Sequence, residues 1–307
     1  MTVPISQEVL ERRAKRELRR IKQRESNIGR AEKMHLVRLA AHKELNLADS
    51  NLAPRFPINK NQYFIGCSGW FYWHWRGDFY PADLPSNQWF NHYASNFDTV
   101  ELNAPFYSWP TVATVKSWLR QAGEKPFVYT VKVCELITHI KRLIGTKELI
   151  KDFGLIADLL DDRMGCFLFQ LPPSFHYSPA RLKAIVSQLD PTRRNVVEFR
   201  HASWWNDTVY YAFQKAGIIF CSCSGPRLPD YLVKTTDDIY IRFHGIKQWY
   251  RHDYSQTELE QWAQRIRKSN AKRTWIYFNN DRDGYAIKNA KMLLNLLSPK
   301  GIYSAGD

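Results

Sequence analysis

From residue 62 onward, short apolar runs alternate with longer stretches in which apolar residues recur every three to four positions. Runs of roughly four to eight apolar residues are typical of buried strands, and the longer periodicity predicts amphipathic helices. Strands are therefore expected at 63–67, 98–102, 127–133, 165–171, 195–199, 218–222, 239–244 and 274–278. Helices are expected near 87–96, 111–122, 147–160, 179–189, 207–216, 256–269 and 284–297.

This alternation implies parallel strands joined by crossover helices. Eight such units over residues 61–307 match the size of a (β/α)8 TIM barrel, which is the fold class that we predict. The segment 225–238 is too short for a helix with its linkers, so one unit is expected to be irregular. An open doubly wound sheet is the alternative, but no GxGxxG motif follows the first strand.

Residues 1–60 show a different pattern and are expected to form a separate basic helical arm with a linker. Helix-forming residues dominate 6–26, and Gly29 is expected to end that first helix. A second helical stretch should follow, because apolar residues recur near one face at Met34, Val37, Ala41 and Leu45. Proline, Asn and Ser in 49–61 predict a linker to the barrel.

A net charge of +14 gives this arm a candidate function. The chain has 44 Lys and Arg against 30 Asp and Glu, and its first 60 residues hold 14 of those cations against 7 acids. Arg-rich helices neutralise nucleic-acid phosphates, so one interpretation is a nucleic-acid-binding arm. The other is a solvated helix packed loosely on the main domain. The cations predicted to contact nucleic acid are Arg12, Arg13, Arg16, Arg19 and Arg20.

The remaining composition is that of an ordinary globular protein, with 44% hydrophobic and 24% charged residues. No apolar run approaches the ~18 residues of a membrane span, so a membrane is not an expected partner. Five cysteines, with no CxxC pair and no secretory leader, favour a reducing cytoplasm as the location.

Residue parity within the predicted strands identifies candidate site residues. Alternate residues of a strand face opposite sides, and in several strands one parity is apolar while the other is polar. The apolar parity should face the helices, and the polar parity should face the barrel interior near the C-terminal mouth, where barrel active sites lie. The polar set is Glu101, Asn103, Lys132, Gln170, Glu198, Arg200, Arg242 and His244. A buried structural ion-pair network is the alternative, because buried charges must pair or bind a ligand.

Several stretches of the sequence resemble the YecE-like proteins, known as domain of unknown function 72. They run in order over about 62–298: IGCSGW at 65–70, WRGDFYP at 75–81, FDTVELNAPFY at 97–107, FQLPPSF at 169–175, VEFRH at 197–201, IRFHG at 241–245 and YFNND at 277–281. The resemblance implies a TIM barrel and leaves the activity open, since none is established for the family. Residues 1–60 lie outside it.

Three kinds of chemistry fit the predicted mouth. Glu101 and Glu198 could serve as the carboxylate pair of a glycosidase, although nearby cations suit an anion better than a neutral sugar. Acid–base catalysis on a phosphodiester or sugar phosphate is favoured, with Glu101, Glu198 and His244 as catalytic residues. A divalent metal is less favoured and the cofactor is otherwise unknown, because no HxH or HExxH spacing is present and Arg200 and Arg242 would oppose a cation.

Further residues complete the predicted ligand site, because they follow strands or lie in the matching stretches. Phosphate sites often form after strands seven and eight of this fold. The substrate-binding set is Asn103, Tyr107, Lys132, Gln170, Arg200, His201, Trp204, Arg242, Asn279, Asn280 and Asp281. The expected partner is thus a small anionic ligand. The alternative function is non-catalytic nucleic-acid binding by the basic arm and exposed aromatic residues.

Overall fold

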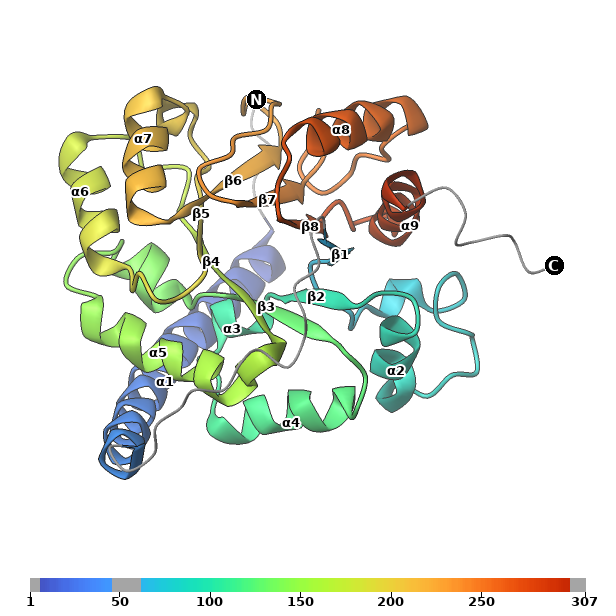
Figure 1. The fold of residues 1–307 in the computed structure, drawn as a ribbon. Helices are drawn as coiled ribbons and strands as arrows, with labels where there is room; N and C mark the ends of the chain where they lie inside the picture. The colour runs from blue at the N-terminus through green and yellow to red at the C-terminus, as the bar shows by residue number, and fades with distance from the viewer. Residues whose placement is uncertain (1–5, 46–61, 299–307) are drawn as a thin grey trace.

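The computed structural model describes residues 6–45 and 62–298. Eight parallel strands form one sheet in the order β1-β8-β7-β6-β5-β4-β3-β2, curled into a nearly closed barrel (Figure 1). This arrangement confirms the predicted (β/α)8 fold. The linker predicted at 49–61 lies outside the described residues. The strands are β1 (Gln62–Cys67), β2 (Thr99–Leu102), β3 (Val128–Lys132), β4 (Met164–Gln170), β5 (Asn195–Glu198), β6 (Ile219–Ser224), β7 (Asp238–Phe243) and β8 (Arg273–Phe278).

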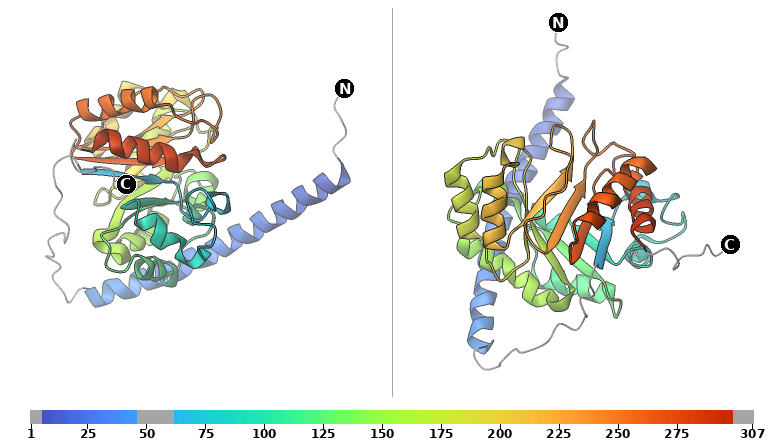
Figure 2. Two further views of the ribbon diagram at one scale, coloured as in Figure 1. Left: turned by 90° about the vertical axis from the view of Figure 1, so that its right-hand side faces the viewer. Right: turned by 45° about the horizontal axis from the view of Figure 1, so that its top comes forward.

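Helices follow the strands and cover the outside of the barrel (Figures 1 and 2). As the sequence predicts, no helix lies in the described segment between β6 and β7. The longer helices are α1 (Gln7–Leu45), α4 (Val112–Ala122), α5 (Lys147–Leu160), α6 (Pro179–Gln188), α7 (Asp207–Ala216), α8 (Gln256–Lys268) and α9 (Tyr285–Leu297). Short turns are α2 (Trp89–Ala94), α3 (Ala104–Tyr107), η1 (Trp73–Trp75), η2 (Ser86–Gln88), η3 (Leu136–Ile140), η4 (Asp161–Arg163) and η5 (Ala202–Trp204).

The strands β1 and β2 meet at the seam of the barrel, where they share no ladder hydrogen bonds. A side chain bridges the two strands there instead. The Tyr93 hydroxyl accepts from the backbone N–H of Cys67 at 2.8 Å and donates to the carbonyl of Thr99 at 3.0 Å. A Cβ on Gly66 would lie 2.3 Å from the Thr99 carbonyl oxygen and 2.8 Å from the Tyr93 hydroxyl. Glycine is therefore required at position 66 for the two strands to approach.

Replacing Gly66 with alanine is expected to destabilise the protein by about 1–3 kcal/mol, because the added methyl group collides with backbone at the seam. Gly154 in α5 is the matched control, since a Cβ there meets nothing within 4 Å. Gly154→Ala should be neutral or stabilising by up to about 1 kcal/mol, through the better helix propensity of alanine. Urea unfolding measures both, and equal midpoints for the two variants would contradict this account of the seam.

Side-chain parity in the strands is as predicted. The apolar parity of the strands, such as Val197 in β5 and Ile241 in β7, packs outward in the large core shared with the helices. A second apolar cluster fills the barrel interior, where the rings of Phe64 and Trp275 stack 4.1 Å apart. This apolar cluster lies nearer the N-terminal ends of the strands. The charged residues of the inward parity therefore lie at the C-terminal end of the barrel.

The helix α1 is continuous over 39 residues, so the expected break at Gly29 is wrong. The barrel holds the helix on both sides of this glycine, which outweighs the ~1 kcal/mol propensity cost of glycine. The amide of Asn27 donates to the Tyr107 carbonyl and accepts from the Trp109 N–H, both at 2.9 Å. Arg30 donates to the Ser108 hydroxyl. The helix is thus anchored beside the loop that follows β2.

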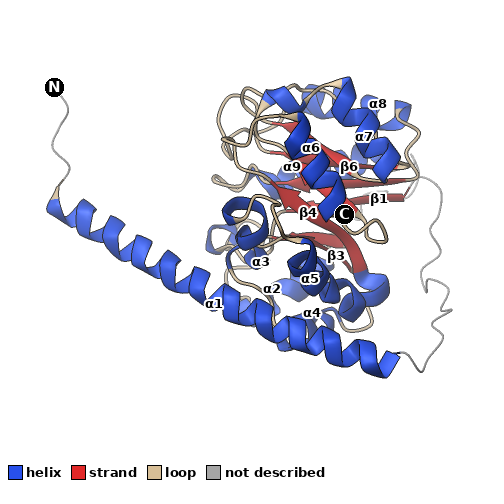
Figure 3. Cartoon of the chain, turned by 90° about the vertical axis from the view of Figure 1, so that its left-hand side faces the viewer, coloured by secondary structure: helices blue, strands red, loops and turns tan. Residues whose placement is uncertain are grey.

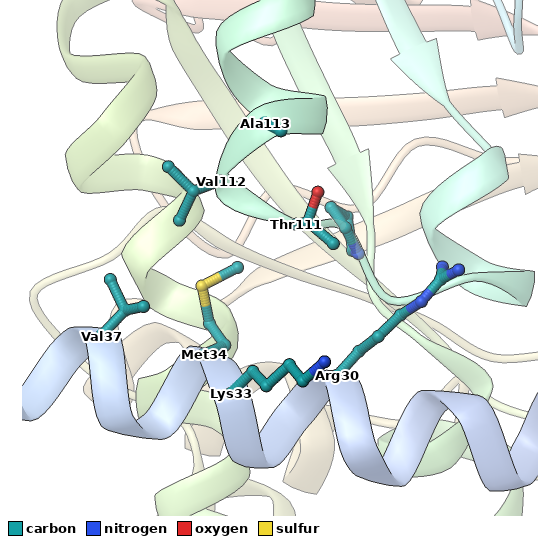
Figure 4. Close-up of a pocket in the computed structure, with 8 residues that line it drawn as sticks. Arg30, Lys33, Met34, Val37, Thr111, Val112 and Ala113 are labelled. Atoms are coloured by element: carbon teal, nitrogen blue, oxygen red, sulfur yellow. The ribbon is translucent and has the colours of Figure 1, made fainter.

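Further along α1, packing continues against α4 and α5. Figure 4 shows Met34 reaching from α1 toward Thr111 and Val112 at the start of α4, beside a cavity of about 230 Å³. Arg38 pairs with Asp152 of α5 at 2.7 Å. The expected loose packing therefore does not describe this half of the helix, in which Asn27, Ala31 and Met34 are buried. No described helix, this one included, is apolar enough over its length to span a membrane.

Candidate functional site

The inward-facing charged residues at the C-terminal end of the barrel form a charged layer. At its centre, a guanidinium group lies between two carboxylates. Arg242 at the end of β7 contacts Glu101 Oε1 through Nη2 and Glu198 Oε2 through Nη1, each at 2.5 Å. Ser68 donates to Glu101 at 2.7 Å, and Tyr240 donates to its other oxygen at 2.5 Å. The two carboxylates that the sequence singles out thus meet across the barrel through one arginine.

The outer side of Glu198 carries two further residues of the predicted set. Arg200 donates to Glu198 Oε1, and His244 Nε2 lies 3.0 Å from the same oxygen. The Asn279 amide lies 3.3 Å from His244 Nδ1. These contacts fit a neutral imidazole that donates from Nε2 to the carboxylate and accepts at Nδ1.

The pKa values of this cluster follow from burial and the cations. Burial alone would raise the pKa of Glu198, but Arg200 and Arg242 outweigh it and hold the pKa well below its ordinary value. Burial, followed by Arg200, lowers the pKa of His244 well below its ordinary value. Burial, followed by Arg242, lowers the pKa of Lys132 to about 7. At neutral pH the cluster therefore holds an ionised carboxylate beside an uncharged imidazole.

The central residues do not themselves line an open mouth. The side chains of Glu101, Glu198, Arg242 and His244 are fully buried, at 0% exposure. They form the buried ion-pair network that the sequence also allowed. Since a paired buried charge is costly to leave uncompensated, this network holds the ends of three strands, β2, β5 and β7, in fixed positions.

A cavity of about 640 Å³ lies beside this network, over the C-terminal ends of β4 to β7. Arg200 connects the two, because it contacts Glu198 and lies 4.4 Å from the centre of the Trp249 ring. Arg227, exposed on the loop after β6, lies on another part of the wall. The lining residues are Gln170, Pro173, Arg200, His201, Ala202, Pro226, Arg227, Trp249 and Tyr250.

Three predicted ligand residues border the cavity: Gln170, Arg200 and His201. His201 Nδ1 accepts from the Ser203 N–H, so His201 caps the start of η5. The Nε2 atom of the neutral ring then carries the proton and can donate to an anion. Lys132 lies 4.2 Å from the Phe106 ring and is not part of the cavity lining.

The remaining predicted residues have structural contacts. Trp204 is fully buried and stacks 4.0 Å from Phe199, so it belongs to the core and its predicted place in the substrate-binding set is wrong. Asn280 is buried and donates to His252 and Asn289. Asp281 accepts from Trp75 at 2.8 Å and contacts His74 at 2.9 Å, and burial raises its pKa to about 6. The Asn103 amide donates to Ser68, and Tyr107 is an exposed neighbour of α1.

A divalent metal does not fit the donor set. Glu198, Cys223 and His244 place ligand atoms within 4.8 Å of one another. However, both oxygens of Glu198 already accept from arginines, whose charge opposes a cation. Asp281 is no alternative ligand, because its two oxygens contact His74 and Trp75.

Four residues of the site were not predicted from the sequence. Tyr240 shares the parity of Arg242, so the same alternation rule could have identified it. Arg227, Trp249 and Tyr250 lie on loops after β6 and β7, where no periodic signal exists. Tyr250 adopts a positive φ of 69°, and its N–H donates to the His244 carbonyl at 2.6 Å, so the loop folds back over the network.

Comparisons with known proteins agree with this architecture. A family model described as "Protein of unknown function DUF72" matches residues 64–305. UPF0759 protein YunF of Bacillus subtilis is 29% identical over 276 residues, covering 76% of this chain and 94% of that protein. A DUF72 protein of Thermotoga maritima (TM1631) has 28% identity and a TM-score of 0.70, with 77% and 99% coverage. One from Enterococcus faecalis (EF0366) has 18% identity and a TM-score of 0.66, with 79% and 100% coverage. Sequence and fold together therefore establish that this chain belongs to the DUF72 family, the family of the YecE-like proteins.

Proposed function

We propose that the cavity beside the ion-pair network binds a phosphorylated ligand, and that the protein cleaves or isomerises a phosphodiester or sugar phosphate there. The observation that carries this proposal is the pair of arginines on the cavity wall, Arg200 and Arg227. A planar guanidinium matches the geometry of phosphate oxygens. Trp249 stacks on the Arg200 guanidinium on this wall, 4.4 Å from the centre of its ring.

Neutral groups of the wall complement these cations. The His201 Nε2–H and the polar end of Gln170 can donate to further phosphate oxygens. In the described part of the cavity lining no carboxylate is present to repel an anion. Lys132 adds positive potential from behind, because its pKa of about 7 leaves it partly protonated at neutral pH.

The catalytic part of the proposal rests on the position of Glu198 directly behind Arg200. A phosphate that binds Arg200 competes with Glu198 for the guanidinium. Because Arg200 is the largest of the charges that lower the Glu198 pKa, its movement toward the ligand makes the carboxylate a stronger base. Glu198 and His244 are then the proposed acid–base pair, and Glu101 holds Arg242 behind them.

Cleavage of bis(p-nitrophenyl) phosphate tests this step, with release of p-nitrophenolate followed by absorbance. We expect turnover by the wild type and a loss of roughly 100-fold or more in Glu198→Gln, as for removal of a general base. Glu148→Gln is the control, because Glu148 is an exposed carboxylate on α5. No release above the uncatalysed rate, or equal rates in the two variants, would refute the catalytic part.

A second candidate is non-catalytic nucleic-acid binding through the N-terminal half of α1. The exposure of all the predicted contact residues favours it: Arg12, Arg13, Arg16, Arg19 and Arg20.

A further inference from the structure

The first part of α1 lies beyond the barrel. Every side chain from 6 to 22 is exposed, and Figures 2 and 3 show this segment projecting away from the barrel past α3. It carries seven cations: Arg12, Arg13, Lys15, Arg16, Arg19, Arg20 and Lys22. Among the described residues only Arg12 of this set forms an ion pair, with Glu8. Most of this positive charge is therefore available to a partner.

The cations are not equivalent around the helix. Asn27, Ala31 and Met34 mark the face that packs on the barrel, at steps of four and three residues. Steps of three and four residues keep to one face of a helix. Continued backward through Arg24, the same steps reach Arg20, Arg16 and Arg13, which we call the arm row. The barrel-facing side of α1 thus becomes cationic where the helix leaves the barrel.

Basic residues also connect the arm row with the cavity. Arg24 pairs with Glu135 at 3.1 Å, next to η3 at the C-terminal end of β3. Two exposed cations, Lys141 and Arg142, follow directly after η3. Arg142 reaches Ser174 at 3.5 Å, and the neighbouring Pro173 lines the cavity. A series of cations therefore leads from the projecting helix along the mouth to Arg200 and Arg227.

We propose that the arm row and the cations of the mouth bind one single-stranded nucleic acid. A repeated anion is needed to engage cations spaced by one helical turn, about 5 Å of rise, along the helix and then around the curved mouth. A flexible single strand can follow this path, whereas duplex DNA, with a persistence length of about 150 base pairs, stays nearly straight over so short a distance. One exposed aromatic ring beside α1, that of Tyr107 at 58% exposure, offers a stacking surface for a base.

Only the far end of this path rests on the proposed phosphate site, so the arm can be tested alone. Labelled dT and rU oligonucleotides of about 30 nucleotides, titrated with the full chain, give the affinity by fluorescence anisotropy at several salt concentrations. We expect the triple variant Arg13→Ala, Arg16→Ala, Arg20→Ala to lose affinity roughly 50-fold at 0.15 M salt, and the salt slope to fall by about 2.

The matched control is Lys15→Ala, Arg19→Ala, Lys22→Ala, which removes the same charge from another face of the same exposed segment. It should lose about fivefold or less, by weakened long-range attraction alone. Circular dichroism checks that both variants keep the helix. Equal losses in the two variants, no binding of either oligonucleotide, or binding only to phosphatidylserine vesicles would overturn the proposal. Retention of glucose 6-phosphate binding in those cases would leave the proposed cavity site intact.

Discussion

Replacing Arg242 with methionine is expected to lower the free energy of unfolding by about 3–5 kcal/mol, which is typical of breaking a buried ion pair from one side. Arg242 is the shared partner of two carboxylates, Glu101 and Glu198, and all three side chains have 0% exposure. Methionine fills similar volume but leaves both carboxylates without this cation. Urea unfolding followed by tryptophan fluorescence gives the difference.

An exposed ion pair is the control for this prediction. Arg265 contacts Asp230 at 3.3 Å, and both side chains are about one-third or more exposed. Arg265→Met should therefore cost no more than about 1 kcal/mol. A loss for Arg242→Met as small as that of the control would show that the network does not hold the strand ends together. In that case the rigid support that we attribute to it would be wrong.

Replacing either arginine of the cavity wall should weaken phosphate binding. We expect Arg200→Gln to lower the affinity for glucose 6-phosphate about 100-fold, since a charge-assisted hydrogen bond contributes about 1.5–3 kcal/mol. Arg227→Gln should lower it about tenfold, because Arg227 is exposed and its contact is more strongly screened. Calorimetric titration measures both affinities.

The Arg227 variant separates binding from folding. Arg200 also pairs with the buried Glu198, so its loss can weaken the fold as well as the site. Arg227 forms no ion pair with any residue that the structure describes, so a loss of affinity there reports the cavity. Arg181→Gln is the control for surface charge, because Arg181 donates to the His176 carbonyl and does not line the cavity. Unchanged affinity in Arg227→Gln would remove this residue from the site.

The fold was predictable from the sequence because the spacing of apolar residues and the lengths of the apolar runs were consistent along the barrel. All eight strands and the seven predicted helices of the barrel are present, with ends shifted by a few residues. The N-terminal helix was harder, because its contacts with the barrel depend on single polar residues. Asn27 lies within a charged, helix-forming run, and nothing in that run marks it as the residue that holds both Tyr107 and Trp109.

The charged layer was predictable from parity, but its exposure was not. Alternation in a strand shows that Glu101, Glu198 and Arg242 face inward, and the structure brings them together. Whether such residues face solvent depends on the loops above them. The fold of the β7–α8 loop, with Trp249 and Tyr250 close to His244, is not encoded in a short periodic pattern. Trp204 was misassigned for a similar reason, because aromatic residues near strand ends serve equally as core.

Thermal unfolding of the wild-type protein with glucose 6-phosphate, compared with glucose, tests the central claim of an anion site most directly. A ligand at about 100 times its Kd stabilises the folded state by about 2.7 kcal/mol, which corresponds to a rise in Tm of roughly 5 °C or more. We predict a saturable rise with glucose 6-phosphate, no rise with glucose, and a smaller rise in Arg227→Gln. Equal Tm values with both sugars, or an undiminished rise in Arg227→Gln, would contradict the claim.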